Sequence, residues 1–249
     1  MKENPFFEKN AEKYAMSKSH KSGEDLDILE NLLKPDRDDV MLDIATGTGF
    51  TAVRLAPLVK MVTASDPTEG MLNQARKLAT ESGILNIKFQ KAAWEDLDPG
   101  SGTYNIITCR RAAHHFYNID MFFSKVYSML RPGGRFAFVD FTTPELDNFD
   151  YFNELERTRD STHVYALKIS DIERLADQYG FTIVSMETRD ETVRFSSWIY
   201  PVDENSMEGI KCREYLENSP TEKSSLIGYD PGNRTFRKTR VIAILQKSG

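Results

Sequence analysis

The sequence has little cysteine, no long apolar run and no excess of positive charge. Cys109 and Cys212 are its only cysteines, and their separation matches neither metal-ligand spacing nor a disulfide framework. No stretch approaches the roughly 20 apolar residues that a membrane-spanning helix requires. The formal net charge of −6 argues against a broad basic surface for nucleic acid. We therefore expect a reduced protein with no metal site, no membrane span and no nucleic-acid partner.

Targeting signals, repeats and low-complexity tracts are also missing. The first residues contain no apolar signal-peptide segment, which predicts a cytoplasmic location. With 249 residues, of which 40% are hydrophobic and 28% charged, the composition is ordinary for a globular protein. This length suits one large α/β domain with a substantial core. We expect a single domain over residues 1–249, as a monomer or a homodimer.

Apolar segments that predict strands alternate with amphipathic segments that predict helices. Strands are expected at residues 40–45, 61–65, 87–90, 104–109 and 135–141, with helices at 51–58, 70–82 and 121–130. This alternation predicts right-handed crossovers and a mainly parallel sheet. Two late strands, 181–187 and 239–246, have no simple crossover helix between them. They predict a hairpin-like edge in which one strand is antiparallel.

The expected elements divide the domain into four parts. Helices over residues 6–19 and 25–33 form an N-terminal helical lid, residues 1–34, and residues 35–141 form the core. Residues 142–168 are rich in Phe, Tyr and charge and interrupt the alternation. We expect them to form a cap insertion. Residues 169–249, beginning with a helix at 170–179, complete the sheet.

The most informative segment is residues 40–52, where a predicted strand enters a glycine-rich loop and then a helix. Gly47 and Gly49 allow a sharp turn and a close approach to a ligand, because neither has a Cβ. The segment also satisfies G-x-G-x-x-A, the dinucleotide fingerprint. However, Asp43 lies within the end of the strand, where it would repel a pyrophosphate. A carboxylate there suits a ligand with positive charge, which favours S-adenosylmethionine over a nicotinamide dinucleotide.

Further landmarks follow in order along the chain. They are Asp66 with Met71 and Leu72, the segment Thr-Cys-Arg-Arg-Ala-Ala-His-His-Phe at 108–116, and Leu-Arg-Pro-Gly-Gly at 130–134. With residues 42–49, these segments resemble the class I S-adenosylmethionine-dependent methyltransferases. Within that class the similarity is to the group related to ubiquinone/menaquinone-biosynthesis C-methyltransferases, and it is strong over residues 10–140. The resemblance implies a Rossmann-like, seven-stranded, mostly parallel sheet of order 3-2-1-4-5-7-6, with the last strand antiparallel and helices on both faces.

The resemblance also implies the cofactor, S-adenosylmethionine, with S-adenosylhomocysteine as its product. Backbone groups around the glycines would line its methionine end, with Asp43 orienting it. Asp66 would accept hydrogen bonds from both ribose hydroxyls, although an aspartate before Pro67 also suits a helix N-cap. The cofactor-binding residues predicted in this way are Tyr14, Asp43, Ala45, Thr46, Gly47, Thr48, Gly49, Asp66, Pro67, Met71, Ala93, Trp94, Glu95 and Arg110.

Some of these residues have a second interpretation. The family usually has an acid where this sequence has Ala93, so either Glu95 or a backbone carbonyl would accept from the adenine amino group. Met71 is placed to touch adenine or to pack in the core. Trp94 either lies beside the adenine ring or packs within its loop. Arg110 binds the cofactor carboxylate or forms a surface ion pair.

Methyl transfer needs alignment of the reacting atoms, and a base only where the acceptor loses a proton. His115, after the strand at 104–109, is the predicted base or acceptor-orienting group, and purely local hydrogen bonding is the alternative. The acceptor is expected to be small and either aromatic or quinone-like. Aromatic segments at 149–152 and 195–200 would form its pocket or the core of the cap. Predicted substrate contacts, some of which would bind an anionic acceptor, are His20, Arg111, Arg157, Arg159 and His163.

Two other functions use the same motifs. One is an NAD(P)-dependent oxidoreductase, which the glycine pattern alone permits. The other is a non-catalytic S-adenosylmethionine-binding protein, which would need no base. An RNA or protein methyltransferase fits less well, because the chain is acidic and has no basic or aromatic nucleic-acid platform.

Overall fold

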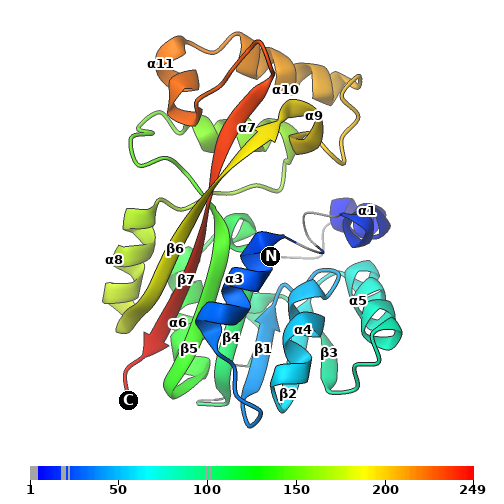
Figure 1. Ribbon diagram of the computed structural model, residues 1–249, viewed down its shortest axis with the longest axis vertical. Coiled ribbons are helices and arrows are strands. Elements are labelled where there is room, and N and C mark those ends of the chain that lie inside the picture. Colours follow the sequence, from blue (N-terminus) through cyan, green and yellow to red (C-terminus); the bar gives the residue numbers. More distant parts are fainter. Residues whose placement is uncertain (1–4, 18–20, 22, 99, 101) are drawn as a thin grey trace.

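The computed structural model describes residues 5–17, 21, 23–98, 100 and 102–249, which contain a central sheet of order β3-β2-β1-β4-β5-β7-β6 (Figure 1). Strands β1 to β5 pair in parallel, and β7 runs antiparallel to both β5 and β6. The predicted order and the antiparallel strand are confirmed. The strands are β1 (Val40–Ile44), β2 (Met61–Asp66), β3 (Ile87–Lys91), β4 (Tyr104–Arg110), β5 (Leu130–Thr142), β6 (Phe181–Arg194) and β7 (Thr235–Lys247).

Helices cover both faces of the sheet. On one face lie α3 (Glu24–Leu33) and α4 (Phe50–Leu55), and on the other lie α6 (Ile119–Met129) and α8 (Ile169–Tyr179). Helix α5 (Glu69–Glu81) follows β2, and α1 (Pro5–Met16) packs against it (Figure 1). Short 3₁₀ helices are η1 (Ala56–Leu58), η2 (Trp94–Asp96), η3 (Ala113–His115) and η4 (Ser225–Ile227).

The central strands are apolar because both of their faces are buried. In β1, Leu42 and Ile44 join the core beneath α6 and α8, whereas Met41 joins the core beneath α3 and α4. Successive residues of a strand point to opposite faces, so one short strand contributes to both cores. Asp43 is the exception, a buried carboxylate within this otherwise apolar strand.

A third core lies beyond the carboxyl ends of the central strands, in a part that we call the cap lobe (Figure 1). Residues 142–168 contribute α7 (Tyr151–Arg159), as the expected cap insertion would. The structure adds a second contribution from the segment between β6 and β7, of which the sequence indicated the aromatic stretch 195–200 but not the helices. Its helices are α9 (Phe195–Trp198), α10 (Met207–Glu217) and α11 (Thr221–Ser224).

Strands β6 and β7 are longer than the sequence indicated. Both continue past the main core and pair with each other as far as Arg194 and Thr235, where they carry the cap lobe. The polar run in the second half of β6 concealed this extension, because alternation with apolar residues is weak there. The long strands place their inward-facing side chains between the sheet and the cap lobe.

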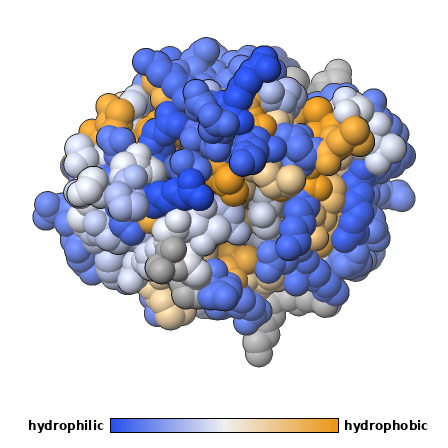
Figure 2. Space-filling view, turned by 90° about the horizontal axis from the view of Figure 1, so that it is seen from below, coloured by the Kyte–Doolittle hydropathy of each residue, from blue (hydrophilic) through white to orange (hydrophobic). Residues whose placement is uncertain are grey.

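Seen from below, at the end opposite the cap lobe, the surface is covered mainly by hydrophilic residues, with several groups of hydrophobic ones between them (Figure 2). Among the described residues, no helix combines the length and the apolar character needed to cross a bilayer.

Candidate active site

A cavity of about 640 Å³ lies between the carboxyl ends of the parallel strands, α1 and the cap lobe. Ligands of open α/β sheets bind at this edge, where loops from neighbouring strands diverge. We call the side formed by the glycine-rich loop and the end of β2 the loop half. The side formed by the loop after β4, the end of β5, the inward faces of β6 and β7 and the cap lobe is the cap half.

The loop half begins with backbone in unusual conformations. Ala45 has a φ of 53° and Gly47 a φ of 55°, both in the left-handed region that side chains disfavour. A Cβ at Gly47 would meet nothing within 4 Å, so this glycine leaves the cavity side of the loop open. Gly49 differs, because a Cβ there would lie 2.8 Å from the Cβ of Ala75 in α5. Gly47 therefore serves the ligand side of the loop and Gly49 the packing of α5.

Asp66, at the end of β2, lines the cavity and is only 5% exposed. Its Oδ2 accepts the backbone N–H of Gly47 at 2.9 Å, and its Oδ1 accepts that of Thr68 at 2.9 Å. The Thr68 side chain also hydrogen-bonds to this carboxylate, which leaves at least one of its roughly four acceptor positions for a hydroxyl donor in the cavity. Burial raises the pKa of Asp66 to about 6. The N-cap of α5 is Thr68, so the alternative interpretation of Asp66 as the helix N-cap is wrong; its bond to the Thr68 N–H holds the turn that leads into α5.

Asp43 lies beneath the loop instead of in the cavity wall. It is 1% exposed and accepts hydrogen bonds from the hydroxyls of Thr46 and Thr108, each at 2.6 Å. Burial raises its pKa to about 6, although both hydroxyl hydrogen bonds act in the other direction. Asp43 thus holds the first turn of the loop to β4. It contributes negative charge below the loop without lining the cavity.

The predicted cofactor residues fall into two groups. Those that line the cavity are Tyr14, Ala45, Thr46, Gly47, Thr48, Asp66, Met71 and Arg110. Those that are described but do not line it are Asp43, Gly49, Pro67, Ala93, Trp94 and Glu95. The Trp94 side chain is 3% exposed and packs against two phenylalanines of the main core, so it does not lie open beside a ligand.

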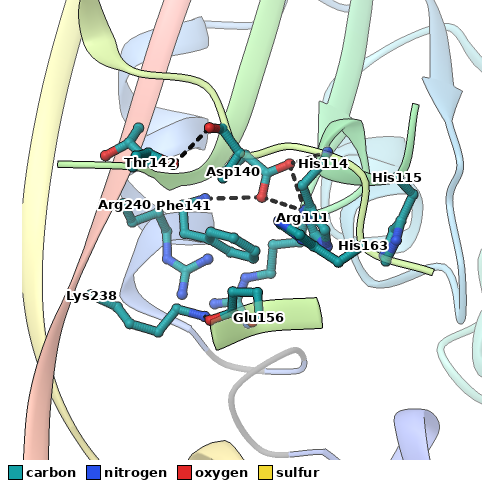
Figure 3. A network of polar contacts seen from close by, with 12 residues as sticks. Arg111, His114, His115, Asp140, Phe141, Thr142, Glu156, His163, Lys238 and Arg240 are labelled. Atoms are coloured by element: carbon teal, nitrogen blue, oxygen red, sulfur yellow. Dashed lines mark hydrogen bonds and ion pairs between the residues drawn. The ribbon is translucent and has the colours of Figure 1, made fainter. Parts of the chain in front are cut away.

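Two adjacent histidines after β4 have different partners (Figure 3). His114 Nδ1 lies 2.8 and 3.0 Å from the two carboxylate oxygens of Asp140. A carboxylate only accepts, so Nδ1 carries the proton and Nε2 is the ring nitrogen left to accept another. His115 Nδ1 lies 3.1 Å from the Thr162 carbonyl oxygen, and burial, with the neighbouring His114, lowers the pKa of His115 to about 4. Both histidines line the cavity.

Asp140 is held in place from several sides. Besides the ring of His114, it accepts the backbone N–H groups of His114 at 3.2 Å and Phe141 at 2.9 Å. Burial disfavours its charge, but the attraction of His114 and these hydrogen bonds keep the pKa of Asp140 below its usual value. The His114–Asp140 pair is therefore a rigid acid–imidazole unit at the end of β5.

A buried ion-pair network forms the wall behind the loop after β4. Arg110 and Arg111 both bind Asp25 of α3, through contacts of 2.9–3.0 Å. Burial alone would raise the pKa of Asp25, but the two arginines hold it well below its usual range. Arg240 of β7 binds Glu191 of β6 at 3.0 Å and lies 3.8 Å from Asp25.

The network continues into the cap lobe through Glu156 of α7, which is fully buried. Its carboxylate accepts from Lys238 Nζ at 2.7 Å, Arg159 Nη2 at 2.9 Å and Trp198 Nε1 at 2.9 Å. Lys238 Nζ also lies 3.9 Å from the centre of the Phe141 ring. Burial lowers the pKa of Lys238 to about 8, in spite of Glu156. Glu156 thus joins both segments of the cap lobe to β7.

Of the predicted substrate contacts, Arg111 and Arg159 line the cavity. Arg157 and His163 do not. Arg157 donates to the Val164 carbonyl and binds Asp150, and His163 Nε2 lies 2.7 Å from Asn153 Oδ1. His20 lies outside the described residues.

The structure adds site residues that the sequence did not single out. Asp140 could have been noticed, since it ends a central strand where ligand-binding side chains gather. Lys238 and Arg240 alternate on one face of β7, but that strand was expected to begin only at residue 239. Of the aromatic segment at 195–200, Trp198 and Tyr200 line the cavity, whereas Phe195 lies in the cap core without lining it.

The sheet order, the open glycine loop after β1 and the buried carboxylate that ends β2 together define a Rossmann-like, class I methyltransferase architecture. Residues 41–134 match the family described as "Methyltransferase domain". The chain is 33% identical over 194 residues to YcgJ of Bacillus subtilis, an uncharacterized methyltransferase, covering 78% of this chain and 77% of that protein. The chain therefore belongs to the methyltransferase family.

Other similarities agree with this assignment. A crystal structure of a Bacillus halodurans protein assigned to the methyltransferases has 30% sequence identity and a TM-score of 0.84, covering 91% of this chain and 100% of that one. The ubiquinone/menaquinone biosynthesis C-methyltransferase UbiE of Rubrivivax gelatinosus is 26% identical over 172 residues, covering 65% and 66%. The predicted resemblance to that group is confirmed.

One more solved structure is similar in fold alone. Phosphoethanolamine N-methyltransferase 2 of Haemonchus contortus, in complex with S-adenosyl-L-methionine, has a TM-score of 0.64 at 17% identity, covering 96% of this chain and 56% of that one.

Proposed function

We propose that the protein transfers a methyl group from S-adenosylmethionine to a small acceptor that is aromatic or quinone-like. The observation that carries the proposal is Asp66, a buried carboxylate in the cavity wall beside the open glycine loop, held in place by the backbone N–H groups of Gly47 and Thr68. A ribose offers two neighbouring hydroxyl donors to this carboxylate. A similar fold has been solved with S-adenosyl-L-methionine in the Haemonchus contortus enzyme, which supports the same cofactor here.

The remaining cofactor contacts follow from the cavity wall. Thr46 and Gly47 would hold the methionine part, with Met71 beside the nucleoside and Arg110 near the carboxylate. The residues at this wall fit a sulfonium nucleoside better than a diphosphate, because Asp43 and Asp66 put two carboxylates around the loop. When bound, the cofactor supplies a methyl carbon that is activated by the positive sulfur.

His114 is the base that the geometry favours. Asp140 keeps the proton of His114 on Nδ1 and stabilises the imidazolium that forms when Nε2 takes a proton from an acceptor hydroxyl. His115, the base predicted from sequence, is the second candidate. Burial lowers the pKa of His115, so its neutral ring would orient the acceptor.

The aromatic character of the acceptor is supported by the cap half. Phe141, Trp198 and Tyr200 all line it, and their rings provide flat apolar surfaces. An acceptor of this kind would pack against them while His114 reaches its reacting hydroxyl.

Calorimetry with S-adenosylhomocysteine and, separately, NADP tests the cofactor assignment. We expect the nucleoside thioether to bind and the dinucleotide not to bind; the reverse would favour the oxidoreductase. Incubation with S-adenosylmethionine labelled in the methyl group and a metabolite extract then distinguishes an enzyme from a silent binder. We expect a labelled small molecule, whereas binding without any labelled product would favour the non-catalytic alternative. The cytoplasmic location and the oligomeric state stay predictions.

A further inference from the structure

The cap half of the cavity holds more positive than negative charge in its ion-pair network. Five cationic side chains, each at most 16% exposed, form ion pairs there with three carboxylates. The cations are Arg110, Arg111, Arg159, Lys238 and Arg240, and all five line the cavity. The carboxylates are Asp25, Glu156 and Glu191.

The two other carboxylates nearby have different partners. Asp140 bonds to His114, and Asp160 accepts from the backbone N–H and the hydroxyl of Thr162. Among the described residues, neither forms an ion pair with a lysine or arginine within 4.0 Å. Glu191 is 44% exposed, so water screens much of its charge. Asp160 and Asp140 act on Arg159 and Arg240 from beyond 4.0 Å and help to raise the pKa of each arginine, so they offset part of the positive charge. Within the described residues, Asp25, Glu156 and Glu191 remain the carboxylates in ion-pair contact with the five cations.

Burying like charges together costs free energy unless an anion compensates them. The effect is visible in Arg111, whose pKa falls to about 10 through burial and through the neighbouring Arg240 and Arg110. In the same network the buried Nε of Arg159 has no hydrogen-bond partner among the described atoms. These groups are poised to receive a ligand that brings negative charge and hydrogen-bond acceptors.

We infer that the methyl acceptor carries an oxyanion, a carboxylate or a phosphate, which binds between Lys238, Arg240 and Arg111 with its apolar part against Phe141 and Trp198. Planar guanidinium groups match the paired oxygens of either anion, and Lys238 adds a compact charge beside the Phe141 ring. Only the identification of this ligand as the methyl acceptor rests on the proposed function. The anion site itself follows from the charge and geometry of the wall.

The methionine carboxylate of the cofactor is the competing source of negative charge. Arg110 and Arg111 follow β4, close to the loop half, and either could meet it. Lys238 and Arg240 lie on β7, and their partners Glu156 and Glu191 belong to α7 and to the outer part of β6. We therefore expect an anion to bind when the cofactor site is already filled.

The test is an NMR titration of the full chain saturated with S-adenosylhomocysteine. Benzoate and phenyl phosphate are the anionic probes, and benzamide is the neutral control of the same shape. We expect at least one anion to shift resonances of the cap half, and benzamide at equal concentration to leave them unchanged. Equal binding of benzamide would overturn the proposal. So would binding of the anions only in the absence of S-adenosylhomocysteine, since the wall would then serve the cofactor.

Two variants on the same ion pair provide matched changes of charge. Arg240→Gln removes a cation, while Glu191 stays half-exposed and Asp25 keeps two arginines. We expect it to weaken anion binding at least about tenfold, the loss of one charged hydrogen bond. Glu191→Gln removes the opposing carboxylate, so the same anion should bind several times more tightly. Equal affinities in both variants and the parent chain would contradict the inference.

The comparison with benzamide needs no variant, so the inference is tested even if Arg240→Gln fails to fold. Failure of S-adenosylhomocysteine to bind would refute the proposed cofactor alone. Benzoate, phenyl phosphate and benzamide would then be titrated into the protein without S-adenosylhomocysteine, and tighter binding of an anion than of benzamide would still support the anion site.

Discussion

The change Asp66→Asn removes the carboxylate that the proposed cofactor site depends on. The substituted amide would keep one neutral acceptor and would turn an N–H toward a backbone donor or a ribose hydroxyl. Hydrogen bonds to a charged acceptor contribute about 1.5–3 kcal/mol each, so losing two of them costs roughly 3 kcal/mol or more. We expect the dissociation constant of S-adenosylhomocysteine, measured by calorimetry at pH 7.5, to rise about 100-fold.

The same change should alter how stability depends on pH. Burial raises the pKa of folded Asp66 to about 6, compared with 3.8 for an unperturbed aspartate. The folded state therefore binds this proton more tightly than the unfolded state, and the ionised carboxylate lowers stability above pH 6. This penalty disappears as the pH falls through 6 toward 4. At about 1.36 kcal/mol per pH unit, the difference between the two pKa values corresponds to roughly 3 kcal/mol.

Urea unfolding of both proteins from pH 4 to pH 8 measures this contribution. We expect the stability of Asp66→Asn relative to the parent to rise by roughly 3 kcal/mol over this range, whatever constant offset the lost backbone hydrogen bond adds. Asp38→Asn, at an exposed carboxylate near the other end of β1, is the control and should leave the binding of S-adenosylhomocysteine unchanged. A flat difference with unchanged binding would refute our account of Asp66.

Three further changes test the base, the network and the loop. Asp140→Asn should slow labelled methyl transfer roughly 100- to 10,000-fold while S-adenosylhomocysteine still binds, because the imidazole loses its orienting partner; an unchanged rate would exclude this dyad as the base. Glu156→Gln should lower the urea-unfolding free energy at pH 7 by about 3–5 kcal/mol, since two buried cations lose their counter-charge. In the parent protein the folded-state pKa of Glu156 lies below the unfolded value of 4.5, so this loss of stability should shrink as the pH falls below 4.5. A loss that is the same at every pH would contradict the role of Glu156 as a buried counter-charge. Gly49→Ala should destabilise the protein more than Gly47→Ala, because the Cβ added at position 49 would lie 2.8 Å from the Cβ of Ala75. Gly47→Ala should cost only about 1 kcal/mol, for the left-handed backbone at that position. Equal unfolding free energies of the two variants would argue against the packing role of Gly49.

Much of the main domain could be predicted because its signals are local. Residues 40–52 combine an apolar strand, a glycine loop and a helix start within one short stretch, and the structure builds β1, the loop and α4 from them. Asp66 was placed correctly at the edge of the sheet, because a residue that ends a parallel strand beside β1 has to lie near the first loop. Alternating strands and helices then leave few possible sheet orders.

Residue chemistry alone could not distinguish the two histidines. Both lie in one short turn, and His114 meets Asp140 only because β4 and β5 pair in the register that sets Arg110 opposite Val139. For the same reason, the loop sequence could not show that Asp43 would be covered by Thr46 and Thr108.

The sequence by itself determined the sheet and the position of the loop, because strand period and glycine conformation act over a few residues. Only the tertiary structure decided which charged side chains line the cap half of the cavity. Asp25 meets Arg110 across 85 positions of the chain, and Lys238 meets Glu156 across 82. The first pair forms when α3 packs onto the sheet beside the end of β4, and the second only when α7 of the cap lobe packs against the extended β7. The net charge of this network is therefore a property of the fold and not of any sequence motif.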